Sequence, residues 1–129
     1  MSQIDSANPY AAEAQQRWPE QVAESNRRLA RLSADEQREL FVRGDQIAQA
    51  LAVAMTSGAT AEADAVQELI AQHFDWICQF WMPSRDAYVG LGQMYVADER
   101  FKARYERIAT GLAEFLKDAM RLYANAHLV

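Results

Sequence analysis

The chain has 129 residues, half of them hydrophobic, so one domain can bury a core and needs neither disulfides nor a structural metal. Thirteen basic against eighteen acidic residues give a net charge of -5, which disfavours nucleic acid as a partner. Cys78 is the one cysteine, and the chain shows neither a secretion signal nor a stretch of about 20 apolar residues, so we expect a cytoplasmic protein without a membrane span.

Helix-forming residues dominate the composition. The sequence contains 24 Ala, against 15 Val, Ile and Thr together, with only 5 Gly and 3 Pro. Alanine has the highest helix propensity, whereas β-branched residues favour strands. We therefore predict one all-α domain over residues 1–129, divided into about seven helical segments.

The first two segments contain few residues that could anchor them. Asn8 and Pro9 are typical of a helix start, and this segment continues to Arg17, where Pro19 interrupts the pattern. The second segment, 20–32, is mostly polar. Its apolar surface is too small to dock firmly against a core.

The third segment starts with a capping box, in which Ser33 and Glu36 satisfy amide groups at the helix start. A long helix should follow, to about Ser57, and Gly58 is a typical stop. The spacing of its apolar residues predicts one buried stripe: Leu40, Phe41, Ile47, Leu51, Ala54 and Met55.

Four further segments follow in the second half of the chain. Thr60 is the predicted cap of a strongly aromatic helix that Pro83 ends. Ser84 and Asp98 are predicted caps of the next two helices, and a bend at Gly111 precedes the last helix.

Catalysis and metal binding have little support in the sequence. A nucleophilic triad would need His73 as its base, but the chain has no glycine-flanked serine and no phosphate-binding glycine loop. His73 and Cys78 would lie on different faces of one helix, which disfavours a metal site, and a lone histidine makes haem a minor alternative. Cys78 is expected to be an inert, partly buried thiol near a helix C-terminus.

Aromatic residues gather around Pro83, at Trp76, Phe80, Trp81, Tyr88 and Tyr95. Two helices that diverge at the proline could leave a concave gap lined by these rings. The aromatic count alone favours such a gap no more than it favours a solid core.

Several motifs together resemble one known family, the TipAS antibiotic-recognition domain. The most specific is Gly90–Phe101, GLGQMYVADERF, followed by a match over 108–116 and by Ala119-Met120. Weaker matches occur upstream in the same order as in the family: 16–18, 23–25, 26–28, 33–36 and the central histidine, His73.

The resemblance implies a haem-free globin-like fold in which residues 1–32 form a mobile helical lid over a body of residues 33–129. It implies binding of bulky peptide-like antibiotics, such as thiopeptides or albicidin. We expect no cofactor and no catalysis. Because the chain begins only a few residues before the motifs, it resembles the stand-alone members that sequester the drug. Thiopeptide sensors of the family carry a reactive cysteine where this chain has Pro83. We therefore expect non-covalent binding and a ligand other than a thiopeptide.

The predicted ligand-binding residues are Trp18, His73, Ile77, Phe80, Trp81, Tyr88 and Tyr95. The alternative is a regulatory protein-interaction module in which these aromatic residues are core. Either a monomer or a homodimer is compatible with the sequence, because an apolar helix face serves a cleft or a dimer contact equally well.

Overall fold

The structure, a computed structural model, describes residues 19–129, so Trp18 and the predicted segment 8–17 lie outside it. The described residues form six α-helices and no strand, and the prediction of an all-α protein is confirmed. The helices are α3 (Pro19–Ala30), α4 (Ala34–Thr56), α5 (Asp64–Ile77), α6 (Arg85–Ala97), α7 (Glu99–Ile108) and α8 (Leu112–His127).

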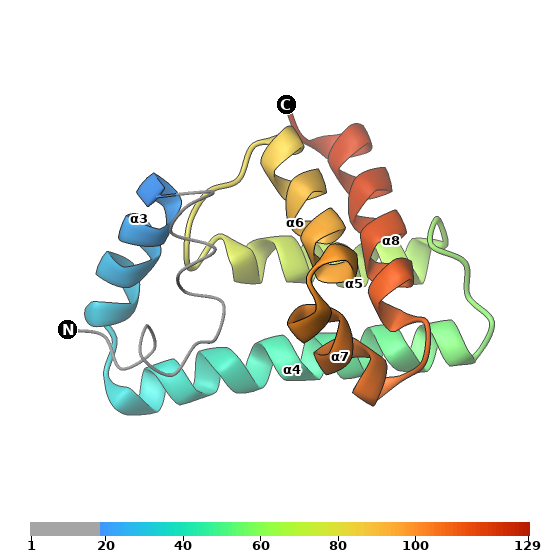
Figure 1. Ribbon diagram of the computed structural model, residues 1–129, viewed down its shortest axis with the longest axis horizontal. Helices are drawn as coiled ribbons and strands as arrows, with labels where there is room; N and C mark the ends of the chain where they lie inside the picture. The colour runs from blue at the N-terminus through green and yellow to red at the C-terminus, as the bar shows by residue number, and fades with distance from the viewer. Residues whose placement is uncertain (1–18) are drawn as a thin grey trace.

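Two layers of helices cross each other in Figure 1. The long helix α4 extends along most of the molecule with α5 packed beside it, while α6 and α8 lie side by side across them. The short helix α7 contacts α4, α6 and α8, and α3 lies at one end of the molecule. No helix in residues 19–129 has the length and apolar character that crossing a bilayer requires.

The predicted caps at three helix starts are confirmed. The Ser33 hydroxyl accepts the Glu36 amide at 3.1 Å, and the Glu36 carboxylate accepts the Ser33 amide at 2.8 Å. Ser84 caps α6, and Asp98 caps α7 through the amides of the next turn. Such caps satisfy donors that have no partner inside the helix.

The start of α8 is capped by a side chain from the preceding helix. Gly111 takes a left-handed conformation, with φ of 90°, and has no side chain to cap with. The two carboxylate oxygens of Glu106 instead accept the amides of Gly111, at 2.8 Å, and Ala113, at 3.1 Å. These bonds lower the pKa of Glu106 and fix the turn between α7 and α8.

The aromatic helix α5 is shorter than predicted at both ends. Its cap residue is Ala63, and Thr60 belongs to a turn in which its carbonyl accepts the Ala63 amide, so the predicted cap at Thr60 is wrong. The helix ends at Ile77, six residues before Pro83, where the amides of Gln79 and Phe80 bond to carbonyls three residues back instead of four. This turn carries the rings of Phe80 and Trp81 beyond the end of the helix.

The core lies where α4, α5, α6 and α8 meet. The prediction that Phe41 belongs to the buried stripe of α4 is wrong, since this residue is 40% exposed. It precedes the part of α4 that the core covers, and its ring contacts Phe80 instead, with centroids 6.3 Å apart. The largest fully buried side chains are Leu51, Val66, Ile70, Tyr88, Leu112, Leu116 and Met120.

Candidate ligand-binding site

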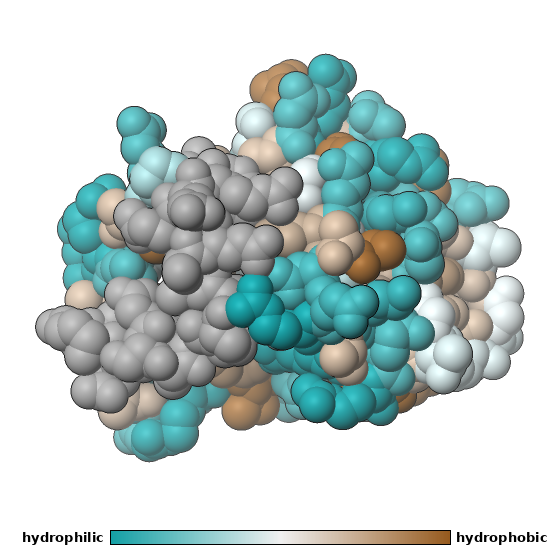
Figure 2. All heavy atoms as spheres, in the orientation of Figure 1, coloured by the Kyte–Doolittle hydropathy of each residue, from teal (hydrophilic) through white to brown (hydrophobic). Residues whose placement is uncertain are grey.

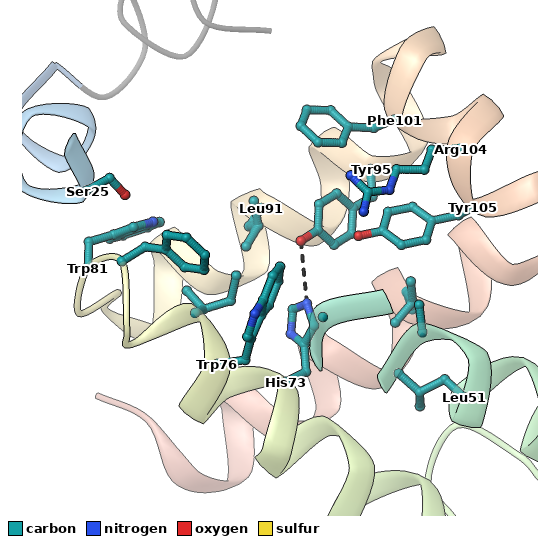
Figure 3. A pocket seen from close by; sticks show the side chains of 15 residues that line it. Ser25, Leu51, His73, Trp76, Trp81, Leu91, Tyr95, Phe101, Arg104 and Tyr105 are labelled. Carbon is teal, nitrogen blue, oxygen red and sulfur yellow. Dashed lines mark hydrogen bonds between the residues drawn. The ribbon is translucent and has the colours of Figure 1, made fainter. Parts of the chain in front are cut away.

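A cavity of about 240 Å³ lies between α3, α4, α5, α6 and α7, and α8 contributes Leu116 to its lining (Figure 3). Pockets that enclose a drug-sized ligand typically have roughly 300 to 1,000 Å³. In this conformation the cavity therefore has room for only part of a bulky molecule. Its lining is Ser25, Gly44, Ala48, Leu51, His73, Trp76, Ile77, Phe80, Trp81, Leu91, Tyr95, Phe101, Arg104, Tyr105 and Leu116.

Most of the predicted site residues come together at this cavity. The lining includes His73, Ile77, Phe80, Trp81 and Tyr95. Tyr88 is fully buried behind His73 and is absent from the lining, while Trp18 lies outside the described residues. The role of these residues as ligand contacts stays a prediction.

His73 is the polar centre of the cavity wall. It is 4% exposed, and its Nδ1 lies 2.7 Å from the Tyr88 hydroxyl, while Nε2 lies 3.4 Å from that of Tyr95. Burial lowers the pKa of His73 to about 4 and raises that of both tyrosines, so the group is uncharged at neutral pH. Because a neutral imidazole has one donor and one acceptor, one hydroxyl donates and the other accepts.

The neighbouring wall is Trp76, which the predicted site did not include. Its indole Nε1 donates a 2.8 Å hydrogen bond to the Leu40 carbonyl, and its ring meets Phe80 edge to face, with centroids 5.2 Å apart. The indole lies directly against Gly44 of α4, where a Cβ would be 2.3 Å from the ring. The aromatic cluster in the sequence was the available signal for Trp76, but its position on Gly44 depends on how α4 and α5 pack.

Replacing Gly44 with alanine is expected to destabilise the protein by about 1 to 2 kcal/mol, because the new methyl overlaps the Trp76 ring. Gly90→Ala is the matched control, since a Cβ there meets nothing within 4 Å. That change should instead stabilise the protein, by roughly 0.5 to 1 kcal/mol, through helix propensity. Urea unfolding of both variants checks the prediction, and a stabilised Gly44→Ala variant would contradict the close packing.

The helix α7 supplies residues that sequence reasoning missed. Phe101, Arg104 and Tyr105 line the cavity opposite α3, with Arg104 above the ring of Tyr95 in Figure 3. The Tyr105 ring packs on Tyr95 at 4.8 Å between centroids. Phe101 ends the motif at 90–101, but the local sequence does not show that α7 faces a cavity, because the turn at Asp98 sets how this helix approaches α6.

Cys78 is partly buried at the end of α5 and is absent from the cavity lining. Burial raises the pKa of its thiol, the Asp75 charge adds to this, and Arg28 opposes it. The raised pKa keeps the group as a thiol at neutral pH, as the sequence predicted. A thiol is a far weaker nucleophile than a thiolate.

Taken together, the described helices form a globin-like all-α domain with a cavity lined by aromatic rings. The TipAS antibiotic-recognition domain matches residues 10–123, and the chain belongs to this family of ligand-binding domains. The fold is also that of TipAS from Streptomyces lividans in its complex with the thiopeptide nosiheptide. The TM-score is 0.81 at 23% identity, covering 92% of this chain and 85% of that one.

Curated relatives include proteins named as HTH-type transcriptional regulators. SkgA of Caulobacter vibrioides is 40% identical over 77 residues, which are 58% of this chain and 30% of that protein. The regulator mta of Bacillus subtilis is 30% identical over 118 residues, 90% of this chain and 45% of its own length. TipA of Streptomyces coelicolor is 24% identical over 121 residues, 92% of this chain and 48% of its length. The chain thus spans less than half of each.

Proposed function

We propose that this domain binds a bulky, hydrophobic, peptide-like antibiotic without forming a covalent bond, and that binding withholds the drug from its target. The observation that carries the proposal is the aromatic cavity beneath α3. A close-packed core would not contain about 240 Å³ of empty space, and this volume is smaller than a whole drug-sized ligand needs. Relatives named as transcriptional regulators support drug sensing as a second use of the same site.

The proposed direct contacts are aromatic and aliphatic side chains on the α5 and α6 sides of the cavity. Phe80, Trp81 and Ile77 offer stacking and apolar surface, and Tyr95 adds a hydroxyl. Each good aromatic pair contributes about 0.5 to 1.5 kcal/mol beyond the burial of area. His73 contacts the Tyr95 hydroxyl and is in turn hydrogen-bonded to Tyr88, so both residues hold Tyr95 in place. Trp18 remains the proposed contact from the lid.

We further propose that α3 moves away from the body to admit the rest of the ligand, as part of a lid formed by residues 1–32. Among the described side chains of α3, only Leu29 is buried. Arg28 donates to the Cys78 carbonyl, and Gln37 donates to that of Leu29 at 2.7 Å. Releasing this one buried side chain and these two hydrogen bonds costs little free energy compared with the surface that a large ligand would cover.

The test is to titrate the protein with albicidin and, separately, with nosiheptide while following tryptophan fluorescence and the melting temperature. Binding should quench the fluorescence and raise the melting temperature, since ligand at a hundred times its Kd stabilises by about 2.7 kcal/mol. Mass spectrometry should recover both protein and drug with unchanged masses, because no reactive thiol lies in the described lining.

Two results would contradict this proposal. If neither compound changes the fluorescence or the melting temperature, the alternative of a protein-interaction module with an aromatic core is favoured. A drug recovered in altered form would instead indicate an enzyme that modifies it.

A further inference from the structure

Among the described residues that line the cavity, Arg104 is the one that carries a charge at neutral pH. The other described lining residues are apolar, aromatic or small, together with the neutral His73, and none of them is a carboxylate. In Figure 3 the guanidinium of Arg104 lies between Phe101 and Tyr105 and above the ring of Tyr95. An arginine keeps its positive charge at every working pH. The cavity therefore has a fixed cation at its α7 rim.

The charge of Arg104 is not neutralised within residues 19–129. On the same helix, Arg100 pairs with Asp98 at 3.0 Å, and Glu106 accepts amides of α8, whereas Arg104 forms no ion pair with a described residue. The helix α7 contains four basic and two acidic residues, although the whole chain has a net charge of -5. Figure 2 shows hydrophilic residues gathered over α7. The rim at α7 is thus locally positive.

We infer, on the basis of the proposed drug-binding function, that the ligand is an aromatic anion whose ring enters the cavity while its acidic group pairs with Arg104. A guanidinium binds a carboxylate or sulfonate through parallel hydrogen bonds. Arg104 is exposed, so its pairing with an anion requires little loss of hydration. A cationic ligand would meet this guanidinium with no carboxylate in the described lining to offset the repulsion.

A matched pair of fluorescent probes tests the inference on the full chain. 1-Anilinonaphthalene-8-sulfonate is anionic, and N-phenyl-1-naphthylamine has the same rings without the sulfonate. The anionic probe should bind about fivefold more tightly, the upper range for an exposed charge pair. Arg104→Gln should remove most of this advantage: its affinity for the anionic probe should fall about fivefold, and its affinity for the neutral probe should fall far less. Arg104→Lys should retain part of it, and added salt should reduce it.

Arg107→Gln is the matched control, because it removes one positive charge from the exposed surface of the same helix, outside the cavity lining. This change should lower the affinity for the anionic probe less than twofold. The anion inference is overturned if Arg104→Gln lowers the affinity for both probes equally, or if wild type binds both probes equally. It is also overturned if Arg107→Gln lowers the affinity for the anionic probe as much as Arg104→Gln does. In those cases binding of the neutral probe would still support the hydrophobic site. If neither probe binds, the proposed site itself fails.

Discussion

Replacing Trp81 with alanine is expected to weaken binding of the aromatic drug about thirtyfold, because a tryptophan that anchors a ligand commonly accounts for 2 kcal/mol or more. Trp81 follows the end of α5 and is only partly buried, at the end of the cavity next to Ser25 of α3 (Figure 3). Its loss should therefore remove a stacking surface while the body keeps its core. Isothermal titration measures the affinity without relying on the tryptophan signal, and circular dichroism measures the helix content.

Met82→Ala is the control for this prediction. Met82 is the next residue along the same loop, is 66% exposed and does not line the cavity. Its replacement should leave the affinity within about twofold of wild type, as is usual for surface positions. A Trp81→Ala protein that loses its helical signal would show instead that Trp81 belongs to the core, and equal losses in both variants would assign the effect to the loop.

Acidification from pH 6.5 to pH 4 is expected to reduce the free energy of unfolding by about 3 kcal/mol through His73 alone. In the unfolded chain this imidazole takes up a proton near pH 6.5, whereas burial lowers its pKa in the folded state to about 4. Between these values the unfolded state binds more protons, so stability falls as the pH falls. Above the window the contribution is complete, and below it His73 causes no further loss.

Urea unfolding at several pH values distinguishes His73 from other acid-sensitive groups. His73→Gln should flatten the pH dependence between 6.5 and 4, because an amide can still bond to the tyrosine hydroxyls but does not titrate. The same change at the exposed His127 should retain the wild-type slope. Glu106, whose pKa is lowered from 4.5, adds a separate loss at lower pH. If the free energy of unfolding of His73→Gln depends on pH as steeply as that of wild type, the imidazole is not the source of this pH dependence.

Much of the fold could be predicted because its signals are local. The caps at Ser33, Ser84 and Asp98 act within about one helical turn, so a few neighbouring residues suffice to recognise them. The end of α5 could not be predicted in this way. The local pattern pointed to Pro83, yet Phe80 and Trp81 bond to the Ile77 carbonyl and form a turn before the proline is reached.

On α6, too, the local sequence predicts one property of the candidate site and the tertiary structure decides another. Tyr88 and Tyr95 are seven residues apart, about two helical turns, so periodicity places both on the inward face. Only the tertiary structure separates them, since Tyr88 fits behind His73 while Tyr95 lines the cavity with residues of α7.

The amino-acid sequence by itself determined the helical class, most helix starts and the presence of an aromatic inward face, because these depend on neighbours along the chain. Which rings border empty space, and that Arg104 stands at its rim, was decided by tertiary packing alone. The reason is physical: periodicity states which face of a helix turns inward, but whether another side chain fills the space there depends on elements distant in sequence.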